Sequence, residues 1–105
     1  MLIYRYKPNN KGENFMEKKL NKMPYAQAKV IIVDNGNIIL RSYYTDVAMI
    51  RSDGWLTING LYSATTRRHI GAFVQEYANI TYQLAKELFL KKFAYNIYTG
   101  EVVPF

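Results

Sequence analysis

The sequence lacks cysteine entirely and contains a single histidine among its 105 residues. Without cysteine the chain forms no disulfide and no thiolate metal site, and one histidine does not supply the several imidazole ligands of a zinc site. Its glycines are isolated from one another, and no glycine run with a following lysine forms a phosphate-binding loop. We therefore expect neither a metal nor another cofactor.

Long apolar runs are also absent, because no stretch approaches the roughly 20 residues that cross a bilayer as a helix. Arg5, Lys7 and Pro8 closely follow Leu2 and Ile3, so the first residues do not resemble the hydrophobic region of a signal peptide. The sequence accordingly predicts a cytoplasmic protein that makes no contact with a membrane.

Apolar residues make up half of the chain, and ten of its residues are tyrosine. A chain of this length buries one modest core, which predicts a single folded domain. The net charge is +6, of which residues 1–24 carry +4 through six basic and two acidic residues. We therefore interpret residues 1–24 as a basic, poorly ordered N-terminal segment and residues 25–105 as a single α+β domain. The segment is either a solvated tail or an arm that follows a phosphate backbone or an acidic partner.

An alternative start is expected at Met16. The codons implied by residues 11–15 contain a purine-rich sequence typical of a ribosome-binding site, a few nucleotides before the codon for Met16. In this hypothesis residues 1–15 are upstream DNA read in frame. The net charge of a chain that begins at Met16 is +4, because three basic residues and one acidic residue are lost.

From residue 28 the pattern is typical of two β-hairpins. Aliphatic and β-branched runs lie on either side of two turns, residues 34–36 and 52–54, which are rich in Asp, Asn, Ser and Gly. The expected strands are residues 28–33, 37–43, 47–51 and 55–58.

The apolar spacing becomes helical after Tyr62. Ser63 is expected to cap a helix that begins at Ala64, and Thr81 to cap a second helix that ends near Lys92. Residues 94–105 read as one short strand or a terminal hairpin. The predicted fold is α+β: an antiparallel sheet of two hairpins, followed by two helices that cover one face and by a short C-terminal strand.

Catalytic residues are not evident in this pattern. The single histidine, His69, follows Arg67 and Arg68 on the expected helix, and a structural or solvated role explains it better than a role as a general base. The carboxylates Asp34 and Asp53 lie in expected turns, where they bond nearby amides. We therefore expect a protein that is not an enzyme.

Binding is better supported than catalysis. Arg67 and Arg68 lie near a helix N-terminus beside two threonines, which fits either an anion site or solvated and ion-paired arginines. The tyrosines outside the helical stripe either cover the sheet or form an exposed contact surface. The candidate residues for contact with a partner or an anion are Arg41, Arg51, Tyr62, Arg67, Arg68, Gln75, Lys86 and Lys91.

Residues 53–89 and 96–102 carry a specific motif, with DGWL at residues 53–56, NGLYS at residues 59–63, and TTR at residues 65–67 followed by His69 and Ile70. This stretch resembles a small domain of unknown function found in phages, plasmids and other mobile elements of Gram-positive bacteria. The resemblance implies a mobile element as the owner of the protein and the cytoplasm of a bacterial host as its location. It supplies no catalytic residues.

Two functions follow as expectations. The first is a non-enzymatic protein that binds and inhibits host defence machinery, in the manner of an anti-CRISPR inhibitor of a nuclease effector, so its partner is a host protein or nucleoprotein. The alternative is a basic DNA- or RNA-binding accessory or regulatory protein. Self-association into a homo-oligomer through an aromatic sheet surface is a third possibility.

Overall fold

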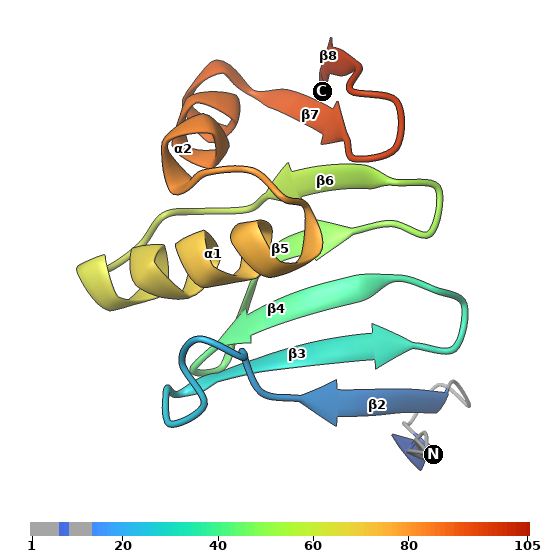
Figure 1. Cartoon of the computed structure of the whole chain (residues 1–105), viewed down its shortest axis with the longest axis vertical. Coiled ribbons are helices and arrows are strands. Elements are labelled where there is room, and N and C mark those ends of the chain that lie inside the picture. The colour runs from blue at the N-terminus through green and yellow to red at the C-terminus, as the bar shows by residue number, and fades with distance from the viewer. Residues whose placement is uncertain (1–6, 9–13) are drawn as a thin grey trace.

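The structure, a computed structural model, describes residues 7–8 and 14–105 and consists of one antiparallel sheet with two helices on one face (Figure 1). The eight strands lie in the sheet in the order in which they occur in the chain, and every neighbouring pair is antiparallel. The strands are β1 Lys7–Pro8, β2 Asn14–Lys18, β3 Ala28–Val33, β4 Ile38–Ser42, β5 Thr45–Ile50, β6 Trp55–Ile58, β7 Phe93–Asn96 and β8 Val102–Pro104.

The helices α1 (Ala64–Tyr77) and α2 (Tyr82–Lys91) connect β6 to β7. The Ser63 hydroxyl accepts a hydrogen bond from the Thr66 amide at 3.2 Å, and the Thr81 hydroxyl accepts one from the Leu84 amide at 3.2 Å. Both expected N-caps are therefore confirmed, as is the α+β class with its antiparallel sheet, two helices and C-terminal strand. Within the part of the chain that the structure describes, neither helix is long and apolar enough to span a membrane.

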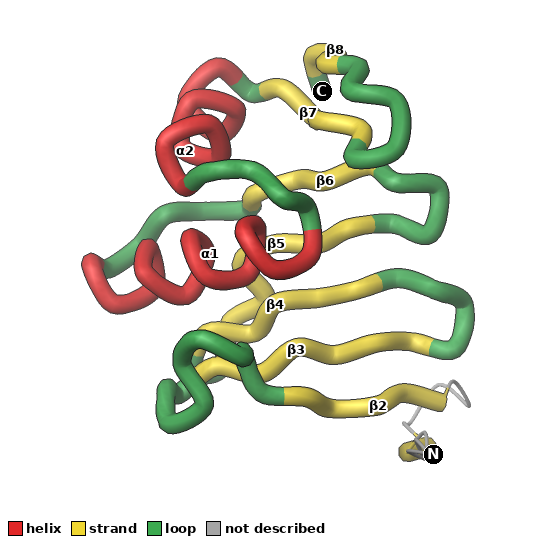
Figure 2. Tube along the Cα trace, in the orientation of Figure 1, coloured by secondary structure: helices red, strands yellow, loops and turns green. Residues whose placement is uncertain are grey.

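Alternation along the strands divides the apolar residues between the two faces of the sheet. Val30 lies opposite Leu40, and Leu40 lies opposite Ala48, on the face against which the helices pack. All three are completely buried, together with Ile70 and Phe73 of α1. Figure 2 shows α1 crossing β4 and β5, whereas α2 lies against β6 and β7. The core is therefore the layer between the helices and one face of the sheet.

Residues 14–24 differ from the poorly ordered segment that was expected for residues 1–24. Strand β2 pairs with β3 from Phe15 opposite Val33 to Lys18 opposite Val30, and Leu20 is completely buried in the core. The folded unit thus extends at least to Asn14 rather than beginning at residue 25. Residues 1–6 and 9–13 lie outside the described residues, so the prediction for them remains a prediction.

The last hairpin is attached to the turn between β5 and β6. The side-chain nitrogen of Asn96, Nδ2, donates to the carbonyl of Asp53 at 3.1 Å, while its side-chain oxygen accepts from the backbone amides of Tyr98 and Thr99 at 2.9 and 3.1 Å. The amide of Ile97 donates to the carbonyl of Gly54 at 2.9 Å. Two turns that are separated by more than 40 residues in the sequence therefore form one unit.

Candidate binding site at a basic, aromatic corner

An open depression of about 490 Å³ lies at one corner of the molecule, where the β2–β3 loop meets the β4–β5 turn. We call this region the basic corner. Its lining includes three lysines and two tyrosines, which is the composition of a surface for an anionic, ring-containing partner. The lining residues are Glu17, Lys18, Lys19, Pro24, Tyr25, Ala26, Gln27, Ala28, Lys29 and Tyr43.

The register of β3 and β4 brings the loop and the turn together. Ala28 lies opposite Ser42, and the amide of Tyr43 donates to the carbonyl of Gln27 at 2.8 Å. Tyr25 on the loop is 96% exposed, and Tyr44 on the turn is 97% exposed. These two rings are therefore presented to solvent from segments that are distant in the sequence.

The turn itself is an unusual place for tyrosine. Tyr43 has a φ of 55°, in the left-handed region that glycine or asparagine usually occupies in a two-residue hairpin turn. Backbone strain of this kind persists only where the surroundings impose it, and it is found most often at functional positions. Tyr43 is half exposed, and its ring lies 5.9 Å from the ring of His69.

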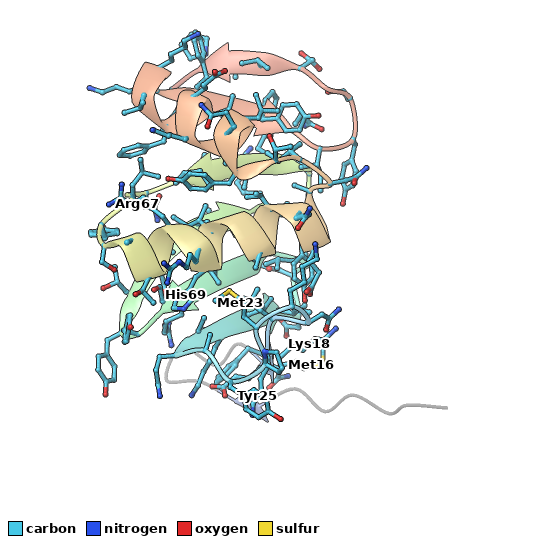
Figure 3. The ribbon with its side chains drawn as sticks, turned by 60° about the vertical axis from the view of Figure 1, so that its left-hand side comes forward. Met16, Lys18, Met23, Tyr25, Arg67 and His69 are labelled. Atoms are coloured by element: carbon cyan, nitrogen blue, oxygen red, sulfur yellow. The ribbon has the colours of Figure 1, made fainter. Side chains whose placement is uncertain are left out.

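Positive charge continues from the corner toward α1. Lys19 is exposed at the start of the loop, and Lys22 donates to the side-chain oxygen of Gln75 on α1. Lys22, Arg68 and Gln75 line an open groove of about 400 Å³ between the loop and the two helices. Figure 3 shows Tyr25 and Lys18 at the same end of the molecule, with Arg67 apart from them on α1.

The arginines that were expected to extend this site lie elsewhere. Arg41 points away from the helices and pairs with Asp46 at 2.7 Å, and this hydrogen bond raises the pKa of Arg41. Arg51 pairs with Asp53 at 2.7 Å beside the β5–β6 turn, at the other end of β5, and the hydrogen bond from Arg51 lowers the pKa of Asp53. Both arginines are therefore neutralised by carboxylates of the same chain.

Four further predicted residues also lie away from the basic corner. Arg67 donates to the carbonyl of Ser63 at 3.4 Å, within its own helix, and Tyr62 is exposed with its ring over Gly60. Lys86 and Lys91 lie on α2. Of the eight predicted residues, the structure thus brings Arg68 and Gln75 together in one groove and places the other six outside it.

The β2–β3 loop contributes residues that the sequence pattern did not predict. Lys19, Lys22 and Tyr25 belong to the segment that was interpreted as poorly ordered or to its border, so they were not considered with Arg68. Only the pairing of β2 with β3 identifies them, because residues 14–18 show no alternation of buried and exposed side chains.

Beneath the corner lies a buried polar network. The Ser42 hydroxyl is 2.8 Å from Nδ1 of His69 and 2.9 Å from the hydroxyl of Thr66, and all three residues are at least 95% buried. Burial lowers the pKa of His69, so the ring is neutral near pH 7. A serine beside a histidine is the geometry of an activated nucleophile, but this hydroxyl is closed to a substrate. The network instead joins α1 to the end of β4, beside Tyr43.

Across residues 7–8 and 14–105, no group of three or more histidine, cysteine, aspartate or glutamate side chains is placed to hold a metal ion.

The fold and the corner define a small α+β domain with an exposed basic and aromatic surface. The chain belongs to a family of unknown function, DUF8033, whose model matches residues 14–92. The match begins at the first residue of β2 and includes the whole β2–β3 loop, both helices and the β4–β5 turn. No curated protein and no solved structure matches the chain.

Proposed function

We propose that this chain is a non-enzymatic binding protein that engages nucleic acid with unpaired bases at the basic corner. The observation that carries the proposal is the almost complete exposure of two tyrosines: Tyr25 lines the lysine-rich depression, and Tyr44 directly follows Tyr43 of the same lining. Of the two functions expected from the sequence, this geometry favours the basic DNA- or RNA-binding accessory or regulatory protein.

The aromatic rings account for a preference for single strands. Bases that stack on aromatic side chains contribute about 1–3 kcal/mol each, and stacking tolerates any base because each has a flat face. In a duplex these faces are covered by neighbouring base pairs. Tyr25 and Tyr44 have no neighbours over most of their surface, so unpaired bases reach both rings.

The lysines account for contact with phosphates. Lys19 and Lys22 lie on the same loop as Tyr25, and Arg68 lies in the adjoining groove. Cations on a surface that tracks a phosphate backbone release counterions on binding, so affinity falls with salt. The basic corner and the groove together offer a path across the loop from Tyr44 toward α1.

The proposal is tested by titrating labelled single-stranded DNA, single-stranded RNA and duplex DNA with the purified protein. We expect binding to both single strands and at least tenfold weaker binding to the duplex. The double variant Tyr25→Ala/Tyr44→Ala should weaken single-strand binding at least tenfold. Tyr98→Ala is the matched control, because Tyr98 is 70% exposed but lies on the β7–β8 turn, at the opposite end of the strands. Equal binding of single strands by the double variant and the unmodified protein would refute the proposal.

A second candidate function rests on a different surface. A groove of about 210 Å³ between α2, β7 and β8 combines Leu84, Leu88 and Phe93 with the charged Glu87 and Lys91. Val102 of β8, which also lines this groove, is 48% exposed. Apolar side chains with a charged rim are typical of a protein interface, which supports the expected inhibitor of a host-defence nuclease effector.

The resemblance to domains of mobile elements supports the same candidate. We propose a phage, a plasmid or another mobile element as the source of the chain and the cytoplasm of its bacterial host as the place of action. An inhibitor forms a stoichiometric complex with the effector and has little affinity for free nucleic acid. Val102→Asp should then abolish the complex, whereas Tyr25→Ala/Tyr44→Ala should leave it intact. Size-exclusion chromatography of each variant with a candidate effector separates the two functions.

A further inference from the structure

The face of the sheet opposite the helices, which we call the uncovered face, carries an unexpected number of apolar side chains. Among the described residues both helices lie on the other face (Figure 2). Ile31 lies opposite Ile39, and Ile39 lies opposite Met49, so these three side chains share the uncovered face. The same alternation places Phe15, Trp55 and Val103 on this face.

A hollow on this face is lined by side chains from its C-terminal half. Its volume is about 490 Å³, and its walls include Met49, Trp55, Ala94 and Val103. Phe105, which is 64% exposed, borders the hollow and is held there by a hydrogen bond from its amide to the carbonyl of Lys92 at 3.0 Å. An exposed phenylalanine fixed beside a half-buried tryptophan is characteristic of a contact surface.

The charges on and around the uncovered face are paired within the chain. Lys29 lies 3.6 Å from Glu17, and the Arg41–Asp46 and Arg51–Asp53 pairs each have a separation of 2.7 Å. These six side chains sum to zero, although the whole chain carries +6. These six side chains therefore offer a polyanion no net positive charge, and the Glu17–Lys29 pair lies at the border between this face and the basic corner.

We propose that the uncovered face binds a second copy of the chain in a symmetric dimer. Because each ion pair is neutral in its own subunit, two copies of this face meet without repulsion between like charges. With strands about 4.8 Å apart and about 3.3 Å per residue, the 35 strand residues present roughly 550 Å². Two copies therefore bury roughly 1,100 Å², which is the size of a weak, transient interface.

The dimer is reversible and depends on protein concentration. It leaves Tyr25 and Tyr44 free, because the β2–β3 loop and the β4–β5 turn that carry them lie beyond the ends of the strands. This inference goes beyond nucleic-acid binding and stands on different residues, so the failure of one does not decide the other.

Sedimentation velocity of the full chain, from low micromolar to near-millimolar concentration, tests the inference. We expect a shift from monomer to dimer, accompanied by a blue shift in the fluorescence of Trp55, the only tryptophan. Val103→Asp and Phe105→Asp, both on exposed side chains, should each shift the midpoint at least tenfold toward higher concentration. Leu90→Asp is the matched control on the helix side and should leave the midpoint unchanged.

Circular dichroism of each variant establishes that the fold is retained. A protein that stays monomeric throughout the concentration range overturns the inference and assigns the uncovered face to a different partner. A dimer that dissociates in Leu90→Asp but persists in both Val103→Asp and Phe105→Asp also overturns it, because the interface then lies on the helices.

Discussion

The hydroxyl of Ser42 lies 2.8 Å from Nδ1 of His69, and this contact joins the last residue of β4 to the middle of α1. The contact is buried together with Thr66, whose hydroxyl lies 2.9 Å from that of Ser42. Buried polar groups stabilise a fold when their hydrogen bonds are made and destabilise it when a partner is lost. The basic corner therefore lies next to a buried hydrogen-bond network whose stability depends on the protonation state of His69.

The first prediction concerns pH. Burial lowers the pKa of His69 in the folded chain below its ordinary value of 6.5, so the unfolded chain binds a proton that the folded chain does not. The free energy of unfolding should therefore fall as the pH decreases below about 6.5, until the folded pKa is reached. Urea denaturation at pH 8 and pH 5 measures this fall, and the variant His69→Gln should show a smaller one. An equal fall in both proteins would exclude His69 as its source.

A second prediction concerns Leu20, which anchors the β2–β3 loop. Leu20 is completely buried, so Leu20→Ala removes core contacts and should lower the free energy of unfolding by about 2–5 kcal/mol. Leu90→Ala is the matched control, because Leu90 is 62% exposed and its truncation should cost less than about 1 kcal/mol. Chemical denaturation measures both. Similar values for the two variants would show that residues 14–24 do not contribute to the core.

Local chemistry explains why most of the fold was predictable from the sequence. Asn35 and Gly36 form a turn between two aliphatic runs, and Ser63 and Thr81 lie directly before helical apolar spacing. Each of these signals depends only on residues that are close together in the sequence, so it determines the local structure whatever the rest of the chain does. Strand β2 was missed because its evidence is non-local: Phe15 and Lys18 alternate between faces only once β3 lies beside them.

The candidate site was less predictable for the same reason. Arg68 and Gln75 are seven residues apart on one helix, so helical spacing places them on the same side. The approach of Tyr25 to Tyr43 depends on the register that pairs Ala28 with Ser42, and nothing in either segment specifies it. Arg41 and Arg51 were predicted to share a site with Arg68 only because all three carry positive charge. In the structure, Arg41 and Arg51 lie on another face of the molecule, and each pairs with a carboxylate that neutralises it.

A third prediction compares two glycines that both have positive φ. Gly54 has a φ of 98°, and a Cβ there would lie 2.6 Å from the Tyr98 ring and 2.8 Å from the Asn96 side-chain oxygen. Gly100 has a φ of 78° and no atom within 4 Å of the same position. Gly100→Ala should cost about 1 kcal/mol from backbone strain alone. Gly54→Ala adds overpacking and should cost about 2–4 kcal/mol in total.

Thermal or chemical denaturation of the two glycine variants checks this difference. Because Asn96 connects the β5–β6 turn to the last hairpin, Gly54→Ala should also increase hydrogen exchange at the amides of Tyr98 and Thr99. Equal destabilisation by the two variants would mean that the contact between the two turns contributes nothing to stability.

The last prediction concerns the salt dependence of nucleic-acid binding. Log affinity for a single strand falls linearly with log salt concentration, and each lysine that contacts a phosphate adds about 0.7 to the magnitude of this slope. Lys19→Gln/Lys22→Gln removes two cations from the basic corner and its adjoining groove, so the magnitude of the slope should decrease by about 1.4. Lys86→Gln/Lys91→Gln removes the same charge from α2 and should leave the slope unchanged. Equal decreases in both variants would mean that only net charge matters, which would exclude the corner as a defined site.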